Sequence, residues 1–233
     1  KDYLPYFSFH YLEYLNLPPS ESGSPFSIAK RYVTSYDDDV EWRWHPYTVS
    51  KRIISICVWL ARGKDSLEPS SGELRQELVR CVSFLERNIE HHVGGNHVLT
   101  NYAAMVIGLT VLERADLEDY EQRYIVELSN QFLSGLHYER SWIYSAQLLA
   151  EALKVANFNS KVYAFSETFL GPKIHHLCET KKYHIDYFGD GIAEQAPELE
   201  NIILAATKLG ITVNEFSQAG HVGESIRVTD GYV

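Results

Sequence analysis

Apolar residues recur along this chain at the three- and four-residue spacing of helices. The spacing predicts helices over the segments 50–62, 70–89, 102–112, 119–134, 141–156 and 160–179. A seventh helix is predicted between Pro197, in its first turn, and Gly210, which ends it. Only 203–205 and 226–233 look strand-like, and the first of these lies inside the seventh helix. The pattern therefore predicts an all-α protein.

The predicted helices differ in how much of their surface is apolar. Segment 102–112 is apolar almost all round, which indicates a helix buried on most sides, whereas the others carry one apolar stripe. Short turns between successive helices predict antiparallel helical hairpins, and the lack of a fixed sequence period argues against a regular solenoid. The alternation of the two kinds of helix suits an α/α toroid, in which hairpins curl around a central cleft.

Composition and charge narrow the range of partners. The 233 residues carry a formal net charge of −10, so the chain has no overall basic field to attract nucleic acid or an anionic membrane. The longest apolar run, 53–61, is too short to span a bilayer. Cys57 and Cys81 lie on apolar helix faces, where we expect buried free thiols. Neither nucleic acid nor a membrane is an expected partner.

The sequence gives no support for a metal or an organic cofactor. Its adjacent histidine pairs, His91–His92 and His175–His176, would point about 100° apart on a helix. No Asp or Glu stands at a tight ligand spacing from them, so we expect no metal site. The chain also lacks the G-x-S-x-G, P-loop and G-x-G-x-x-G motifs, and we expect no cofactor.

Both ends of the sequence suggest a piece of a longer protein. It begins at Lys1 without a signal-peptide pattern, and 226–233 look like the start of a strand. We therefore expect an α/α domain over 1–220 and a linker or first strand over 221–233. The compartment is left open: periplasmic or secreted if the full-length protein carries a signal peptide, cytoplasmic otherwise.

The stretch "GGNHVLTN" (94–101) places an amide and an imidazole side by side at a predicted helix start. Asn96 can cap the helix, but capping leaves His97 unexplained. The alternative is that this corner faces a ligand, with the two glycines letting the backbone approach it closely.

Two further stretches of polar and aromatic residues lie at predicted helix ends. Segment 135–147 holds Tyr138, Glu139, Arg140 and Tyr144 close to Ser141, which can cap the helix 141–156. Segment 42–52 holds Trp44, His45 and Arg52. In a stack of hairpins such corners meet at one rim and form a polar site in an aromatic frame. Each residue also has a structural reading, with Glu139 and Arg140 as a solvated ion pair and Tyr144 as a core tyrosine.

These stretches carry a resemblance to a known family. The segments "FSFHYLEYLN" (7–16), "WHPYTVSKRI" (44–53), "LERNIEHHVGGNHVLTNYAAMVIG" (85–108), "GLHYERSWIYSAQLLAEAL" (135–153) and "YFGDGIAEQAP" (187–197) resemble the heparinase II/III-like polysaccharide lyases in order and spacing. The resemblance implies an α/α toroid followed by an antiparallel β-sandwich, of which this chain would hold mainly the toroid. It also implies β-elimination on an acidic polysaccharide, such as a heparan-type glycosaminoglycan or alginate.

The resemblance also assigns roles to the candidate residues. Asn96 and His97 would neutralise the substrate carboxylate, since removing the neighbouring proton creates an enolate-like dianion. Tyr144 would pass a proton to the departing glycosidic oxygen, and in some relatives it also removes the first proton. Base duty would require a positive neighbour, for which Arg140 is a candidate. The remaining residues expected to line or support the site are Trp44, His45, Arg52, Tyr138 and Glu139.

The chain departs from the family at several positions. Ser145 stands where the family usually has a histidine, Thr100 where it often has an acidic residue, and Ser55 where it often has an asparagine. A further catalytic histidine belongs to the β-sandwich. We therefore expect the isolated chain to be weakly active or inactive. The alternatives are a carbohydrate-binding or assembly module, and a helical scaffold for protein partners.

Overall fold

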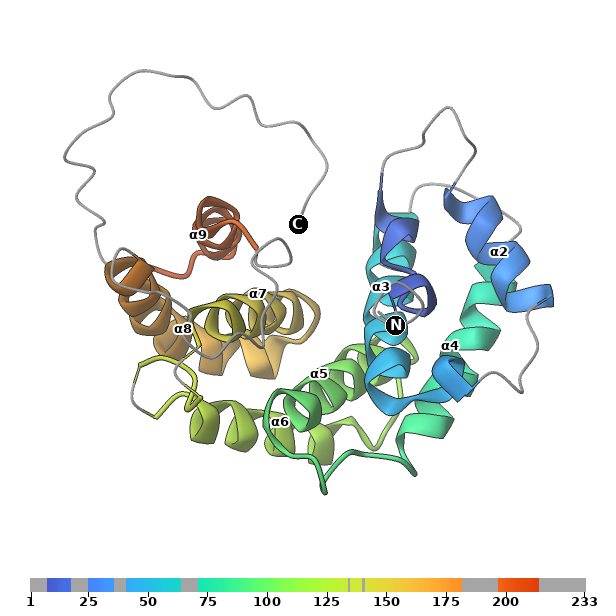
Figure 1. The fold of residues 1–233 in the computed structure, drawn as a ribbon, viewed down its shortest axis with the longest axis horizontal. Coiled ribbons are helices and arrows are strands. Elements are labelled where there is room, and N and C mark those ends of the chain that lie inside the picture. The colour runs from blue at the N-terminus through green and yellow to red at the C-terminus, as the bar shows by residue number, and fades with distance from the viewer. Residues whose placement is uncertain are drawn as a thin grey trace, which may run out of the picture. The chain divides into compact units, whose positions relative to one another are not determined.

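The computed structural model describes residues 8–17, 25–35, 41–63, 71–133, 135–139, 141–181 and 197–213. Across these residues the regular secondary structure is helical, with no β-strand (Figure 1). The prediction of an all-α protein is therefore confirmed for this part of the chain. The strand-like segment 226–233 lies outside it.

The helical elements occur throughout the described part of the chain. In chain order they are η1 (Glu13–Asn16), α2 (Pro25–Ser35), η2 (Glu41–Trp44), α3 (Pro46–Arg62), α4 (Ser71–Leu85), α5 (Gly95–Val111), α6 (Leu117–Gln131), α7 (Trp142–Phe158), α8 (Ser160–Lys181) and α9 (Leu199–Lys208). The chain divides into two compact units, Lys1–Tyr124 and Ile125–Val233, and the boundary falls within α6. Each unit has its own set of buried apolar side chains.

Helix α3 is the centre of the first unit, since α4, α5, η1 and η2 all pack against it. It runs antiparallel to α4, because the ring of Trp44 lies near that of Phe84 while Arg52 reaches back to Glu77. Helix α5 runs alongside α3, and every residue from 98 to 109 is buried. The prediction of a helix buried on most sides is confirmed.

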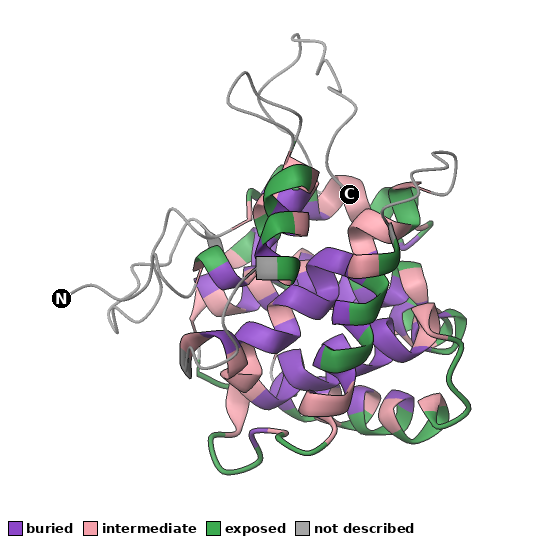
Figure 2. Ribbon diagram, turned by 90° about the vertical axis from the view of Figure 1, so that its right-hand side faces the viewer, coloured by how far each residue is buried: buried purple, intermediate pink, exposed green. Residues whose placement is uncertain are grey.

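A glycine in α5 allows these helices to approach closely. A Cβ atom at Gly108 would lie 2.9 Å from Cγ2 of Val82 on α4 and 3.0 Å from Cγ2 of Ile53 on α3. Such contacts are shorter than a packed core accepts without rearrangement. In Figure 2 buried positions, in purple, gather in the interior of the packed helices, and exposed positions, in green, lie mainly at the periphery.

The second unit is built on an antiparallel pair, α7 and α8, with α9 packed against α7. Only Asn159 separates the two helices, and its Oδ1 accepts hydrogen bonds from the N–H groups of Lys161 and Val162 at 3.1 and 3.0 Å. At the other end of the pair, Nε1 of Trp142 donates to the carbonyl of Leu177 at 3.1 Å. The expected antiparallel hairpin is present here.

Helix ends differ from the sequence-based prediction at two places. Helix α4 ends at Leu85 and not at Ile89, because the N–H of Asn88 turns back to the carbonyl of Leu85 at 3.0 Å. Helix α9 begins at Leu199, so Pro197 precedes the N-cap, while Gly210 follows the helix with a φ of 74°. Residue 70, where the sequence predicts the start of this helix, lies outside the described residues.

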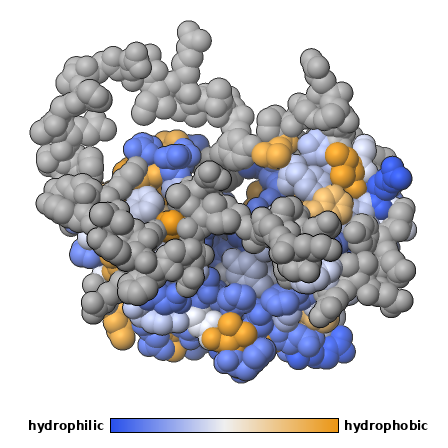
Figure 3. All heavy atoms as spheres, viewed as in Figure 1, coloured by the Kyte–Doolittle hydropathy of each residue, from blue (hydrophilic) through white to orange (hydrophobic). Residues whose placement is uncertain are grey.

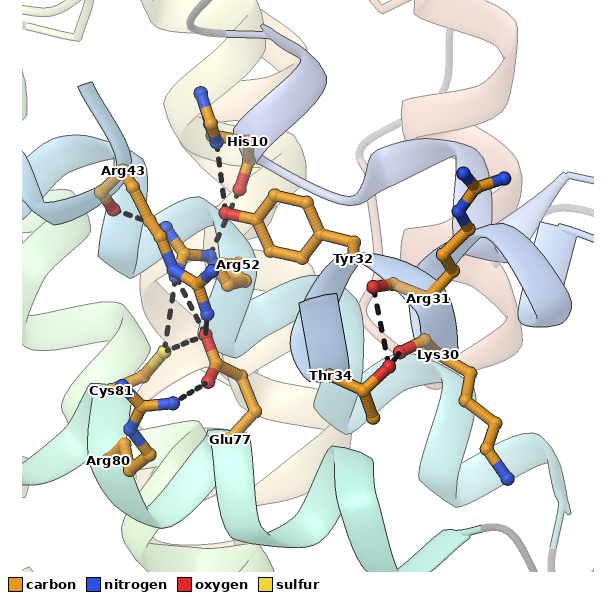
Figure 4. A network of polar contacts seen from close by, with 10 residues as sticks. All are labelled: His10, Lys30, Arg31, Tyr32, Thr34, Arg43, Arg52, Glu77, Arg80 and Cys81. Atoms are coloured by element: carbon orange, nitrogen blue, oxygen red, sulfur yellow. Dashed lines mark hydrogen bonds and ion pairs between the residues drawn. The ribbon is translucent and has the colours of Figure 1, made fainter. Parts of the chain in front are cut away.

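A buried ion network joins the elements of the first unit (Figure 4). Arg43, Arg52 and Glu77 are almost completely buried, and Oε1 of Glu77 accepts from Arg43 at 3.2 Å and from Arg52 at 2.9 Å. Nε of Arg52 donates to the carbonyl of His10 at 3.1 Å, and its NH2 group donates to the carbonyl of Arg43. One guanidinium therefore ties the N-terminal turn, η2 and α4 to α3.

The three cysteines Cys57, Cys81 and Cys178 are free and buried, as predicted for the first two. Burial raises the pKa of the Cys81 thiol to about 12.

None of the described helices is long and apolar enough to cross a membrane. On the face drawn in Figure 3, the described apolar residues are scattered among hydrophilic ones.

Candidate functional site

The start of α5 is shaped by two glycines with positive φ. Gly94 has φ 70° and ψ −156°, and Gly95 has φ 55°. The first of these conformations is essentially restricted to glycine. A side chain at Gly94 would meet no described atom within 4 Å, so backbone conformation accounts for the residue without any close approach.

Asn96 is not the cap of this helix. The N-cap is Gly94, which has no side chain to accept a hydrogen bond, and α5 already begins at Gly95. The two glycines turn the chain into the helix before Asn96 is reached, which places Asn96 and His97 in the first turn. Both are partly exposed. The helix start therefore presents an amide and an imidazole, and the capping role predicted for Asn96 is wrong.

His97 is held by a buried carboxylate. Its Nδ1 lies 3.0 Å from Oε1 of Glu90, whose side chain is 3% exposed, whereas the imidazole is 32% exposed. The His97 ring also lies against that of Tyr47, with centroids 4.7 Å apart. Burial opposes ionisation of Glu90, but the hydrogen bond and charge of His97 and the amide of Asn101 outweigh it, so the pKa of Glu90 lies below its usual value.

A second layer of hydrogen bonds fixes Glu90. Nδ2 of Asn101 donates to Oε2 of Glu90 at 3.1 Å and to Oγ of Ser50 at 3.0 Å. Oδ1 of Asn101 accepts from the backbone N–H of Glu90 at 2.8 Å. Ser50 in turn donates to the carbonyl of Pro46 at 2.9 Å. This chain of bonds links the turn before α5 to the first turns of α3, so the position of His97 depends on both.

The residues predicted from segment 42–52 divide into two groups. His45 lies beside the carboxylate of Glu90, with Nε2 3.9 Å from Oε1, and its side chain is 43% exposed. Trp44 is partly exposed and packs on Phe84, with the guanidinium groups of Arg43, Arg52 and Arg80 near its ring. Arg52 is fully buried in the ion network. His45 therefore belongs to the surface around His97, whereas Arg52 belongs to the buried ion network.

Tyr144 lies in the first turn of α7, in the second unit. The N–H of Tyr144 donates to Oγ of Ser141 at 3.2 Å, which confirms the predicted cap. The ring of Tyr144 meets that of His137 edge to face, with centroids 6.2 Å apart. His137 is completely buried, with Nε2 2.9 Å from Oε1 of Gln131. A capped helix start thus holds a partly exposed phenol against a buried imidazole.

Ser145 serves the fold. Its hydroxyl donates to the carbonyl of Ser141 at 2.7 Å and accepts from the backbone N–H of His137 at 3.0 Å. The residue is completely buried. The hydroxyl thus stabilises the turn before α7 both as a donor and as an acceptor.

The other residues predicted around Tyr144 are exposed or outside the described part of the chain. Tyr138 is 54% exposed and lies over the ring of His137, with centroids 4.5 Å apart. Glu139 is exposed, and its N–H lies 3.4 Å from Nδ1 of His137. Arg140 lies outside the described residues.

Two buried histidines should make the fold sensitive to acid. Burial lowers the pKa of His10 to about 4, with a further contribution from Arg52 and Arg43, and burial alone lowers the pKa of His137 to about 4. The unfolded chain takes up these protons near a pKa of about 6.5. The folded state is therefore favoured fully above about pH 6.5 and loses this advantage as the pH falls to about 4.

We expect the free energy of unfolding, measured with urea at a series of pH values, to fall across this interval. His137→Asn should remove part of the slope. His92→Asn, at an exposed position, is the control and should leave the slope unchanged. A stability that is constant between neutral pH and about pH 4 would contradict this account.

No group of three or more metal-ligating side chains is arranged to hold a metal ion among the described residues. In the adjacent pair His175–His176, the ring of His176 packs over Gly135, because a Cβ atom at Gly135 would lie 2.7 Å from that ring.

Two residues of the site around His97 escaped the sequence-based interpretation. Glu90 lies in a turn, seven positions before its partner, and no local pattern connects the two. Asn101 did carry a signal, because it lies four positions after His97 on the same helix face and is polar in an apolar stretch.

Comparison with known protein families, with curated proteins and with solved structures gave no significant match.

Proposed function

We propose that this chain forms the helical part of a polysaccharide lyase that cleaves a uronic-acid-containing glycan by β-elimination. The observation that carries the proposal is the partly exposed imidazole of His97, which lies next to Asn96 and is held by the buried carboxylate of Glu90. The resemblance of segments 85–108 and 135–153 to the heparinase II/III-like lyases supplies the reaction class.

In the proposed reaction the proton on the carbon next to the uronic carboxylate is removed, and the bond from the adjacent carbon to the glycosidic oxygen breaks. A carbon–carbon double bond forms, and the departing oxygen takes up a proton. Negative charge accumulates on the carboxylate in between. Asn96 and His97 are the donors proposed to stabilise it, and the positive end of the α5 dipole adds to their effect.

Tyr144 is the proposed proton donor to the departing oxygen. Its neighbour His137 has a lowered pKa and is neutral at neutral pH, so it adds no positive charge that would favour a phenolate. A protonated phenol suits the acid role, and a free tyrosine titrates near a pKa of about 10. The first proton passes to a separate base, for which we propose the further catalytic histidine that the resemblance places on the β-sandwich.

A carbohydrate-binding module is the second candidate. It is favoured by Ser145, which occupies the position of a family histidine. The Ser145 hydroxyl forms its hydrogen bonds within the turn before α7. A chain without that imidazole could still hold a uronic carboxylate at Asn96 and His97. Binding of oligouronides without turnover would then be the expected behaviour.

Ultraviolet absorbance of unsaturated uronic ends separates the two candidates. We expect these products when the 233-residue chain is combined with a β-sandwich domain, and little or no product from the chain alone. Asn96→Ala should lower turnover about 10²-fold, the scale for loss of one donor to a developing anion.

The matched control is Asn88→Ala, at an exposed position before the same helix. Its turnover should equal that of the unaltered protein. Oligouronide binding without unsaturated products, with the β-sandwich present, would replace the lyase by the binding module.

A further inference from the structure

Glu90 is a buried carboxylate whose contacts all come from the surroundings of the candidate site. One oxygen lies 3.0 Å from Nδ1 of His97 and 3.9 Å from Nε2 of His45, and the other accepts from Asn101. Its backbone closes the turn that leads into α5, since its carbonyl accepts from the N–H groups of Val93 and Gly94. Side chain and backbone of this residue therefore act on the same helix start.

The contact between Glu90 and His97 determines where the imidazole carries its proton. An ionised carboxylate accepts hydrogen bonds and donates none. The pKa of Glu90 is lowered, so the group is ionised at neutral pH and Nδ1 of His97 must be the donor. The other ring nitrogen, Nε2, then carries no proton in the neutral ring.

Asn101 makes this arrangement specific. Its amide donates to Glu90 and Ser50 and accepts from the Glu90 backbone, so neither the carboxylate nor the amide can turn without losing bonds. Asn101 is completely buried, which makes each lost bond costly. Asn101 therefore fixes the carboxylate of Glu90, and that carboxylate in turn fixes the ring of His97.

We propose that Glu90 is the positioning residue of His97: it fixes the ring with Nδ1–H toward the protein and Nε2 toward the ligand. When the imidazole is protonated, Nε2–H donates to the ligand and Glu90 balances the positive charge. The identity of the ligand as a uronic carboxylate rests on the proposed function. The orientation and the tautomer of the His97 ring do not depend on it. The titratable groups His45 and Tyr47 also contact this cluster.

The tautomer can be read directly from the ¹⁵N chemical shifts of the His97 ring, at a pH where the ring is neutral. We expect Nδ1–H in the unaltered protein and mainly Nε2–H in Glu90→Ala, because the acceptor for Nδ1–H is gone. Glu90→Gln keeps an acceptor without the charge and should retain more of the original tautomer. Glu86→Ala, which removes a partly exposed carboxylate paired with Arg114 at 2.8 Å, is the control.

Affinity for an oligouronide is the second measurement. We expect Glu90→Ala to weaken binding about tenfold or more, the scale for one hydrogen bond to a charged group. Nε2–H in the unaltered protein, or Nδ1–H retained in Glu90→Ala, would overturn the positioning role. If Glu90→Ala does not fold, the unaltered protein and Glu90→Gln still decide the tautomer.

The two measurements keep the proposals apart. If the tautomer differs between the unaltered protein and Glu90→Ala but neither binds an oligouronide, the positioning role of Glu90 stands and the lyase proposal is rejected. Equal oligouronide affinity in the unaltered protein and Glu90→Ala leaves the lyase intact and overturns the role of Glu90 toward the ligand.

Discussion

The Glu77→Gln variant should lose about 3 to 5 kcal/mol of unfolding free energy, the scale for breaking a buried ion pair by removing one charge. Glu77 is the carboxylate that Arg43 and Arg52 share in the core of the first unit, and all three are almost completely buried. Glutamine has nearly the same shape, so the loss would come from two buried guanidinium groups left without a counter-charge. Urea unfolding followed by tryptophan fluorescence measures it.

Glu73→Gln is the matched control, one helical turn earlier on α4. Its carboxylate pairs with Lys30 at 3.0 Å, and both side chains are more than a third exposed. Exposed pairs contribute little, so the unfolding midpoint should barely move. Equal stabilities of Glu77→Gln and the unaltered protein would show that the network does not hold this unit together.

Tyr144→Phe should lower lyase turnover about 10²- to 10⁴-fold, the range for one general acid or base. The change removes only the hydroxyl proposed to protonate the departing oxygen. Because the cap by Ser141 uses the backbone N–H of residue 144, the helix start should survive. Oligouronide affinity should also stay close to that of the unaltered protein, which separates this effect from misfolding.

Tyr163→Phe controls for the loss of a tyrosine hydroxyl elsewhere in the same unit. The Tyr163 hydroxyl donates to the carbonyl of Leu209 at 2.9 Å, so this variant should lose about 1 kcal/mol of stability and no turnover. Normal product formation by Tyr144→Phe would show that another group protonates the leaving oxygen.

The helices were predictable because their signals are local. The apolar character of segment 102–112 predicted the burial of α5. Ser141 is the N-cap of α7, as its sequence context predicted. The first turn of α5 was misjudged because a glycine with positive φ can start a helix without a side-chain cap. Sequence spacing does not reveal that φ.

The candidate site was predictable only in part. His97 and His45 lie on one surface, as expected of residues from two helix starts, but the carboxylate between them comes from a turn. Arg52 was expected to line or support a cleft, and its place is in the core, because its donors match the carbonyl group of His10 and the carboxylate of Glu77, both remote in sequence. Such partners depend on tertiary contacts.

The consecutive glycines at 94 and 95 separate two tasks at the start of α5. Backbone direction is determined at these positions, where positive φ values turn the chain into the helix. Side-chain chemistry is determined at the next two, Asn96 and His97, neither of which caps the helix. For protein engineering, positions 96 and 97 thus form a cassette in which other donor and acceptor pairs can be installed on an unchanged backbone turn.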